Sequence, residues 1–190
     1  MQKIALDLDG VIFDSENLYR VYTEMYDVDV MKKDSLIDNE QRIYQNRYNW
    51  SNEDKIKFYD KYAPIVLSTA NFMAGADIVL PKLSKLFDLV IITSRNKETA
   101  QYAVNKLKKI GLNIEVFSDE QQKINRLKTE DCDYIIDDDI NICMNAASNG
   151  IKALYFKNAA AREIISTDYI TTVNNWGEIY KFFMLYGEEK

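Results

Sequence analysis

Two aspartates separated by one residue, Asp7 and Asp9, follow a short apolar run at residues 4–6. Side chains two apart in an extended strand point to the same side, so both carboxylates should lie together where the strand ends. Two buried anions repel each other unless a cation lies beside them, and Mg²⁺, which prefers oxygen ligands, is the expected cation. Gly10 then permits a sharp turn. An ordinary strand that ends in an Asp-Gly turn is the alternative interpretation.

Two later apolar runs also end in polar residues. Thr93-Ser94-Arg95 follows residues 89–92, and Asp137-Asp138-Asp139 follows residues 134–136. If these runs are parallel strands, their carboxyl ends meet at one edge of the sheet, where such folds place their ligands. The sequence therefore predicts a pocket in which Asp7, Asp9 and one or two of Asp137 and Asp138 surround Mg²⁺.

This set of residues suits phosphoryl transfer, which needs mainly positioning and the neutralisation of charge. A carboxylate can be the nucleophile and form an aspartyl-phosphate. A second carboxylate, with its pKa raised by like charges, can protonate the leaving oxygen and then activate water. We expect Thr93 to bind phosphoryl oxygens and Lys123 to balance the charge.

The elements that must position these residues alternate between strands and helices from about residue 86 onward. We expect strands at residues 89–92, 114–117, 134–136, 152–156 and 170–173, and helices at 98–109, 121–127, 142–147 and 175–186. Such alternation is typical of a parallel sheet covered by helices on both faces. The predicted fold class is therefore α/β, a Rossmann-like parallel sheet flanked by helices.

Residues 15–84 differ from the rest of the chain, because their pattern predicts helices and they are rich in tyrosine. One helix should begin at Ser15, a second should begin after Ser51 and end near Pro64, and a third should cover residues 78–87. Pro81 leaves the start of the third helix open. The segment interrupts the alternating pattern, so we expect a helical insertion after the first strand.

Composition narrows the classes of function. The chain has 190 residues, a net charge of −6 and no histidine. The absence of histidine excludes histidine-based catalytic triads and zinc-histidine sites. The negative charge argues against a nucleic-acid polymer as partner.

No apolar run approaches the ~20 residues of a membrane span. Cys132 and Cys143 lack metal-binding spacing, so we expect core thiols, and without a basic-then-apolar leader we expect a cytoplasmic location.

With these residues in view, the sequence resembles the haloacid dehalogenase-like (HAD) superfamily of phosphotransferases. The superfamily's motifs occur here in order as Asp7-Leu-Asp-Gly-Val11, Val90-Ile-Ile-Thr93, Lys123 and Tyr134-Ile-Ile-Asp-Asp138. The resemblance implies a core formed by residues 1–14 and 85–190. Residues 15–84 lie where the superfamily inserts a cap, here a small helical one.

The resemblance also implies roles for individual residues. Asp7 would be the nucleophile and Asp9 the general acid-base, with the Asp9 carbonyl on Mg²⁺. Thr93 and Lys123 would be catalytic and bind the phosphate. Ser94 and Arg95 would also contact the substrate. Asp138 would be the direct metal ligand with Asp137 in support. Because Asp139 is a third consecutive acid, which two of the three match the motif stays open.

Within the superfamily the sequence is similar to 5′(3′)-deoxyribonucleotidases. The shared stretches are the first motif, Ile92-Thr-Ser-Arg95, Asn149-Gly-Ile-Lys-Ala-Leu-Tyr-Phe156 and Val173-Asn-Asn-Trp176. This likeness implies a Mg²⁺-dependent 5′-nucleotidase on (deoxy)nucleoside monophosphates, with a homodimer left open. Tyr44, Tyr48, Trp50 and Phe13 could stack on a nucleobase, or they could be core residues.

Other functions stay open. A phosphatase or mutase acting on another small phosphate ester, such as a sugar phosphate, would suit the same motifs. From another class, a non-catalytic or receiver-like Mg²⁺-binding regulatory module would use similar residues. Receivers, however, carry the phosphorylated aspartate on a middle strand, and here the acid pair comes first.

Overall fold

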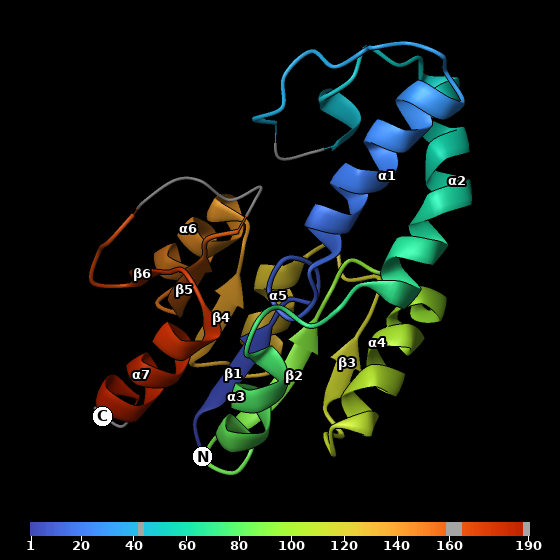
Figure 1. Cartoon of the computed structure of the whole chain (residues 1–190). Helices are drawn as coiled ribbons and strands as arrows, with labels where there is room; N and C mark the ends of the chain where they lie inside the picture. Colours follow the sequence, from blue (N-terminus) through green and yellow to red (C-terminus); the bar gives the residue numbers. More distant parts are fainter. Residues whose placement is uncertain (42–43, 159–164, 188–190) are drawn as a thin grey trace.

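A six-stranded, wholly parallel sheet forms the centre of the computed structural model, which describes residues 1–41, 44–158 and 165–187 (Figure 1). The strand order is β3-β2-β1-β4-β5-β6, and the fold class is therefore α/β as predicted. The strands are β1 (Lys3–Leu6), β2 (Asp88–Ile92), β3 (Glu115–Phe117), β4 (Tyr134–Asp137), β5 (Lys152–Phe156) and β6 (Ile170–Val173).

Apolar strands form this sheet because both of its faces are covered. Alternate residues of β1 enter different cores: Ile4 and Leu6 belong to one buried cluster, and Ala5 belongs to the other. The same alternation separates Ile135 from Ile136 in β4. A period of two on a sheet buried on both sides explains why the inner strands β1, β2, β4 and β5 are largely continuous apolar runs, whereas the edge strands β3 and β6 contain polar residues.

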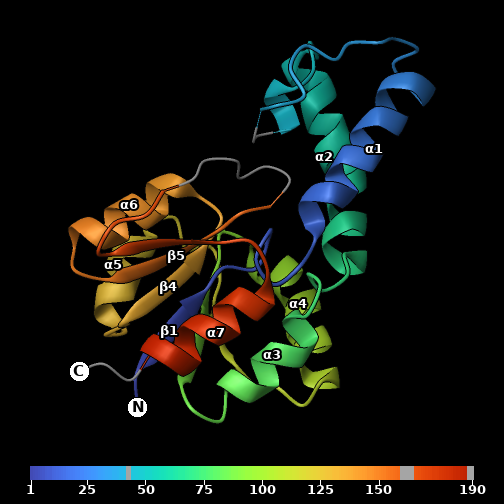
Figure 2. The same ribbon diagram turned by 60° about the vertical axis from the view of Figure 1, so that its left-hand side comes forward.

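Seven α-helices and one short 3-10 helix are found among the described residues. Helices α3, α4 and α7 lie on one face of the sheet, and α5 and α6 lie on the other (Figures 1 and 2). Side chains of the first three helices belong to the first cluster, and those of α5 and α6 belong to the second. The helices are α1 (Ser15–Asp29), η1 (Tyr44–Asn46), α2 (Asn52–Thr69), α3 (Ala76–Leu83), α4 (Lys97–Lys109), α5 (Lys123–Thr129), α6 (Ile140–Ser148) and α7 (Trp176–Tyr186).

Helices α1 and α2 stand beyond the carboxyl ends of the strands, together with η1 (Figure 2). They have a third buried cluster of their own, which we call the cap core. It consists of Tyr26, Tyr44, Tyr48, Trp50 and Phe58. The chain passes between the sheet and this unit twice, and the two crossings pair with each other through a bridge between Phe13 and Phe72.

Helix α3 lies within the predicted insertion of residues 15–84 but packs against the sheet. Its side chains Ala76, Val79 and Leu80 belong to the sheet cluster, and its neighbour is α7. The helical unit that stands apart therefore consists of α1, η1 and α2. The division into a core of residues 1–14 and 85–190 and a cap of residues 15–84 stays a prediction.

The predicted strands agree with the observed ones to within one residue, but two helix ends differ by four residues or more. The expected stop near Pro64 is wrong, because α2 continues to Thr69. Pro64 faces solvent, and the burial of Val66 and Leu67 stabilises the last turn. The third helix ends at Leu83 rather than residue 87, because the Lys85 amide donates to the Lys82 carbonyl and the Pro81 carbonyl accepts the Ser84 hydroxyl instead.

Candidate active site

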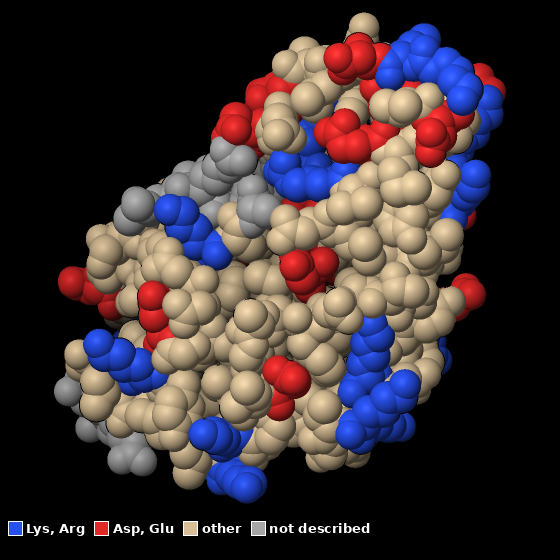
Figure 3. Space-filling view, viewed as in Figure 1, with Lys and Arg blue, Asp and Glu red and all other residues tan. Residues whose placement is uncertain are grey.

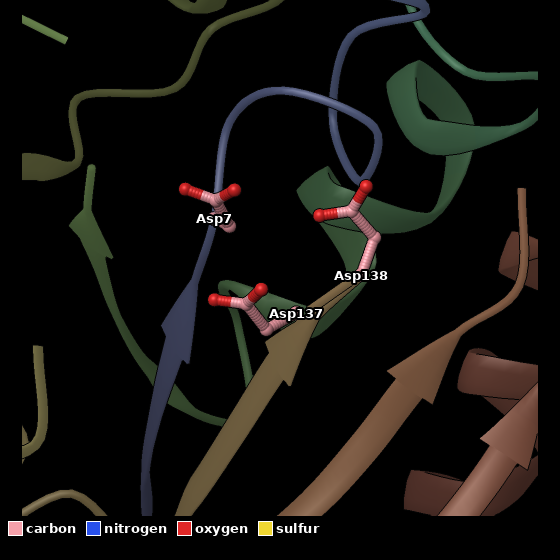
Figure 4. A group of neighbouring side chains, drawn as sticks. All are labelled: Asp7, Asp137 and Asp138. Atoms are coloured by element: carbon pink, nitrogen blue, oxygen red, sulfur yellow. The ribbon is translucent and has the colours of Figure 1, made fainter. Parts of the chain in front are cut away.

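Three carboxylates converge at the carboxyl edge of the sheet (Figure 4). Asp7 directly follows β1, Asp137 ends β4 and Asp138 comes next. One oxygen from each lies within 4.8 Å of the others, and all three residues are buried. The strand register explains the convergence, because Leu6 pairs with Ile136 and the Asp7 amide donates to the Ile136 carbonyl at 3.0 Å. We call Asp7, Asp137 and Asp138 the acid cluster.

Lys123, the first residue of α5, joins two members of the acid cluster. Its Nζ lies 2.9 Å from Oδ1 of Asp7 and 2.8 Å from Oδ2 of Asp137. Burial by itself would lower the pKa of Lys123, but Asp137 and Asp7 outweigh it and raise that pKa above its ordinary value. Lys123 is therefore a protonated lysine between two carboxylates, and its role toward a phosphate stays a prediction.

Asp7 has unusual electrostatics for a carboxyl group. Burial is the largest influence and raises its pKa; Lys123 opposes this, and Asp137 and Asp138 raise the pKa further, to about 7. One lysine does not compensate for three converging carboxylates. The cluster consists of oxygen donors with surplus negative charge, and it therefore fits a hard divalent cation.

Asp9 lies outside the acid cluster and pairs with Arg95. The Arg95 Nε–Oδ2 distance is 2.8 Å and the Nη2–Oδ1 distance is 2.6 Å, a bidentate geometry. Burial alone would raise the pKa of Asp9, but the Arg95 charge and hydrogen bonds hold it below its ordinary value. Asp9 is thus an ionised carboxylate in this arrangement. Its role in acid-base chemistry and metal binding stays a prediction.

The second motif provides a hydroxyl and a cavity wall. Thr93 directly follows β2, is buried, and accepts a hydrogen bond from the Arg95 amide at 3.2 Å. Ser94 and Arg95 line a cavity of about 550 Å³, which Asp7 and Asp9 also line. All the predicted site residues therefore lie at one edge of the sheet. What each contacts in a substrate remains a prediction.

The cap provides the opposite wall of this cavity. Glu16 and Tyr19 come from α1, Tyr44 and Gln45 from η1, and Tyr59 from α2. A small molecule in the cavity would therefore lie between the acid cluster and the helical cap. Basic side chains form small, separate groups on the face seen in Figure 3, which does not suggest a surface for a long polyanion.

Tyr48 and Trp50 belong to the cap core. The Tyr48 hydroxyl donates to Glu24 at 2.7 Å, and the Trp50 indole donates to Asp27 at 2.6 Å. Both rings are buried and stack on each other with centroids 4.6 Å apart. Of the interpretations offered for these residues, burial in a core is confirmed. Phe13 is also a core residue and contacts Phe72.

Tyr44 belongs to the cap core but also lines the cavity. Its ring stacks on Tyr19 at 4.9 Å and contacts Phe58 at 5.3 Å. The stacked Tyr19 ring occupies one face of the Tyr44 ring.

Asp139 has a structural role. Its Oδ1 accepts the Asn141 amide at 2.9 Å and caps α6, while its own amide donates to Asp137 at 2.8 Å. The carboxylates in the cluster are thus the first two of the three consecutive acids. Cys132 and Cys143 are both buried free thiols, as expected for core cysteines.

Sequence reasoning missed Asn158. Its side-chain amide donates to Oδ2 of Asp138 at 2.8 Å and to the carbonyl of Gly10 at 2.9 Å. A signal was present, because Asn158 lies two residues after the apolar run at residues 152–156. The rule that strand ends form the site applies to this strand as it does to the others.

No family model matches the chain. Over 179 residues it is 22% identical to a protein from Clostridium acetobutylicum named nucleotidase, covering 93% of this chain and 91% of that one. A haloacid dehalogenase-like hydrolase from Streptococcus pneumoniae superposes with a TM-score of 0.71 at 18% identity, covering 96% and 98% of the two chains.

Two further solved structures are similar. A predicted phosphatase from Clostridium acetobutylicum has a TM-score of 0.70 at 15% identity, covering 96% of this chain and 98% of that one. A magnesium-bound HAD-hydrolase from Bacillus subtilis has a TM-score of 0.68 at 14% identity, with 97% and 99% covered. The chain thus has the fold of the HAD-superfamily hydrolases, and at the level of fold the resemblance found in the sequence is confirmed. Among the described residues, no helix is both long and apolar enough to cross a bilayer.

Proposed function

We propose that this protein is a Mg²⁺-dependent phosphomonoester hydrolase that acts through an aspartyl-phosphate. The observation that carries the proposal is the convergence of Asp7, Asp137 and Asp138 with Lys123 at the edge of the cavity. Phosphoryl transfer needs such a concentration of charge more than it needs reactive side chains. The name and titles of the similar proteins, a nucleotidase and a phosphatase, support the same class of reaction.

We expect the acid cluster and the main-chain carbonyl of Asp9 to hold Mg²⁺. Within the cluster, Asp138 is the proposed direct side-chain ligand, and Asp137 supports it. Bound Mg²⁺ would neutralise the carboxylates and the phosphoryl oxygens of the substrate. Lys123 would stay protonated between Asp7 and the phosphate. Thr93, Ser94 and Arg95 would bind the remaining phosphoryl oxygens.

In the proposed reaction, a carboxylate oxygen of Asp7 forms a bond to phosphorus while the bond from phosphorus to the ester oxygen breaks. Asp9 gives a proton to that departing oxygen. It then takes a proton from water, which attacks phosphorus, releases phosphate and restores the Asp7 carboxylate. Because Asp9 is ionised in its pair with Arg95, its role as an acid requires that the pair open and that the carboxylate take up a proton from solvent before the ester bond breaks.

The proposed substrates are (deoxy)nucleoside monophosphates, small enough for a cavity of about 550 Å³. The relative named nucleotidase supports this choice. A sugar phosphate is the second candidate, favoured by one observation: Tyr48 and Trp50 are buried in the cap core and Tyr44 stacks on Tyr19, so fewer ring faces are available for stacking on a nucleobase than the sequence indicated.

The test is phosphate release from a panel of nucleoside monophosphates, sugar phosphates and p-nitrophenyl phosphate, with Mg²⁺ or with a chelator. We expect release that depends on Mg²⁺ and is fastest with nucleotides. Faster turnover of sugar phosphates than of nucleotides would make sugar phosphates the substrate class. Acetyl-phosphate labelling without turnover would favour a signalling module. No release from any ester would contradict the proposed function.

The role of Lys123 has its own test. The Lys123→Met variant keeps the length of the side chain but leaves Asp7 and Asp137 without their shared cation. We expect a large loss of turnover, whereas the matched change Lys128→Met, at an exposed position of the same helix, should have little effect. Normal kinetics of Lys123→Met would show that another lysine holds this position.

A further inference from the structure

Asn158 connects three chain segments beside the acid cluster. It lies just beyond β5, and its Nδ2 donates both to Oδ2 of Asp138 at 2.8 Å and to the carbonyl of Gly10 at 2.9 Å. A side-chain amide nitrogen carries two hydrogens, so it can satisfy both acceptors at once. The end of β4 and the loop after Asp9 are thereby held at a fixed separation.

Gly10 makes this close approach possible. Its φ is +77°, a conformation that side chains disfavour. A Cβ atom there would lie 2.4 Å from Nδ2 of Asn158 and 2.4 Å from Oδ2 of Asp138, too close for either group to stay in place. A glycine at this position is therefore required by the Asn158 contacts as well as by the turn.

The chemistry of this connection differs from that of the other acids in the site. Lys123 binds Asp7 and Asp137, and Arg95 binds Asp9, and each of these partners brings a positive charge. Asn158 is a neutral donor that fixes the position of the Asp138 carboxylate by a hydrogen bond. Carboxylates that bind metal ions are typically oriented by hydrogen-bonded partners of this kind.

We propose that Asn158 is a positioning residue for a divalent cation at the acid cluster: it ties Asp138 to the Gly10 loop, so that this carboxylate stays within reach of a cation shared with Asp7 and Asp137. The inference rests on the metal-binding part of the proposed function. Partners that orient metal ligands in this way typically contribute roughly 10- to 100-fold to metal affinity.

The test measures binding of Mn²⁺ alone, in the absence of substrate, from the electron paramagnetic resonance signal of the free ion. In the full-length protein, Asn158→Leu keeps a similar side-chain volume and removes both donors. We expect its Mn²⁺ affinity to fall roughly 10- to 100-fold. Asn145→Leu, at an exposed position of α6, is the matched control and should bind as the parent does.

A double-mutant cycle separates positioning from a general effect on structure. If Asn158 acts through Asp138, the Asn158→Leu change should cost little further affinity when Asp138→Asn is already present. An equal loss in both backgrounds would contradict the proposal. Gly10→Ala displaces the same contacts from the other side and should weaken Mn²⁺ binding similarly, which provides a second route if Asn158→Leu does not fold.

Parental affinity in a folded Asn158→Leu variant, judged by circular dichroism, would overturn the inference. A parent protein that binds Mn²⁺ but releases no phosphate would contradict the proposed hydrolase while leaving the inference intact. A parent that binds no Mn²⁺ would contradict both.

Discussion

The two walls of the cavity are held together by different forces. The acid cluster and Lys123 lie at the ends of strands whose register is fixed by backbone hydrogen bonds, and their side chains interact as charges. The opposite wall belongs to a helical cap held together by the five aromatic rings of the cap core. One wall thus consists of charged side chains at strand ends, and the other belongs to a unit whose buried core is aromatic.

The difference indicates how the two walls should respond to substitution. In the acid cluster, a change of one atom leaves the sheet intact but alters charge, so chemistry should suffer more than stability. In the cap core, removing a ring opens a void, so stability should suffer more than the chemical step. The following predictions test this contrast, from the largest expected effect to the smallest.

Asp7→Asn preserves shape and removes the nucleophile. We expect phosphate release to fall on the order of 10³-fold or more, since the reaction loses its attacking group. The far-ultraviolet circular dichroism spectrum should stay that of the parent. Asp60→Asn, an exposed change on α2, is the matched control and should keep full activity. Substantial turnover by Asp7→Asn would exclude Asp7 as the nucleophile.

Asp9→Asn should discriminate between substrates by their leaving groups. Loss of a general acid costs about 10²- to 10⁴-fold where the departing oxygen needs a proton. Nucleotides have such a leaving group, whereas nitrophenolate leaves unaided, so we expect nucleotide hydrolysis to slow far more than hydrolysis of p-nitrophenyl phosphate. The comparison uses kcat for both substrates in the parent and the variant. Equal slowing would contradict the acid role.

Phe58→Ala should damage the cap. Phe58 is fully buried and its ring contacts those of Tyr26, Tyr44, Trp50 and Tyr62. We expect the free energy of unfolding, measured in urea, to fall by about 3–5 kcal/mol. Ile56→Ala, exposed on the same helix, should change it by less than about 0.5 kcal/mol. A parental stability of Phe58→Ala would show that the cap core is loosely packed.

Metal binding should depend on pH through Asp7. The folded protein raises the pKa of this carboxyl from 3.8 to about 7, by burial first, so Mg²⁺ must displace a proton below that pH. We expect Mg²⁺ to bind about tenfold more weakly at about pH 6 than at about pH 8, measured by isothermal titration calorimetry. Asp7→Asn lacks the titrating group and should lose this dependence.

The raised pKa of Asp7 weakens metal binding at low pH, but in the absence of metal it stabilises the folded state at low pH. The folded state holds a proton that the unfolded chain releases, so this contribution to stability is complete below about pH 4 and disappears as the pH rises through about 7. The depressed pKa of Asp9 acts in the other direction and is lost as the pH falls. Mg²⁺ should therefore raise the melting temperature more at the higher pH. An equal increase on both sides of pH 7 would contradict the value for Asp7.

The strands and the floor of the cavity could be predicted because they follow from local patterns. A strand buried on both faces is a continuous apolar run, and the residue after it must lie at the edge of the sheet. The pattern therefore predicts that Asp7, Thr93 and Asp137 lie together. The same pattern applies to Asn158, which follows β5.

The helical segment was less predictable because helix ends and packing partners depend on distant residues. Pro64 indicated a helix end, yet Val66 and Leu67 are buried and α2 continues. Helix α3 lies inside the predicted cap by sequence but packs against α7. Tyr44, Tyr48 and Trp50 suited either a ligand or a core, and only their contacts with one another and with Phe58 decided between these interpretations.

The sequence by itself determined the α/β class, the order of the four motifs and the edge of the sheet where the acids meet, because strand periodicity and strand ends are local properties. The tertiary structure decided that Asp7 pairs with Lys123 whereas Asp9 pairs with Arg95, 86 residues away. It also brought Asn158 to Asp138. Which charge a buried carboxylate contacts depends on how remote segments pack, and that packing gives two aspartates two residues apart opposite pKa shifts.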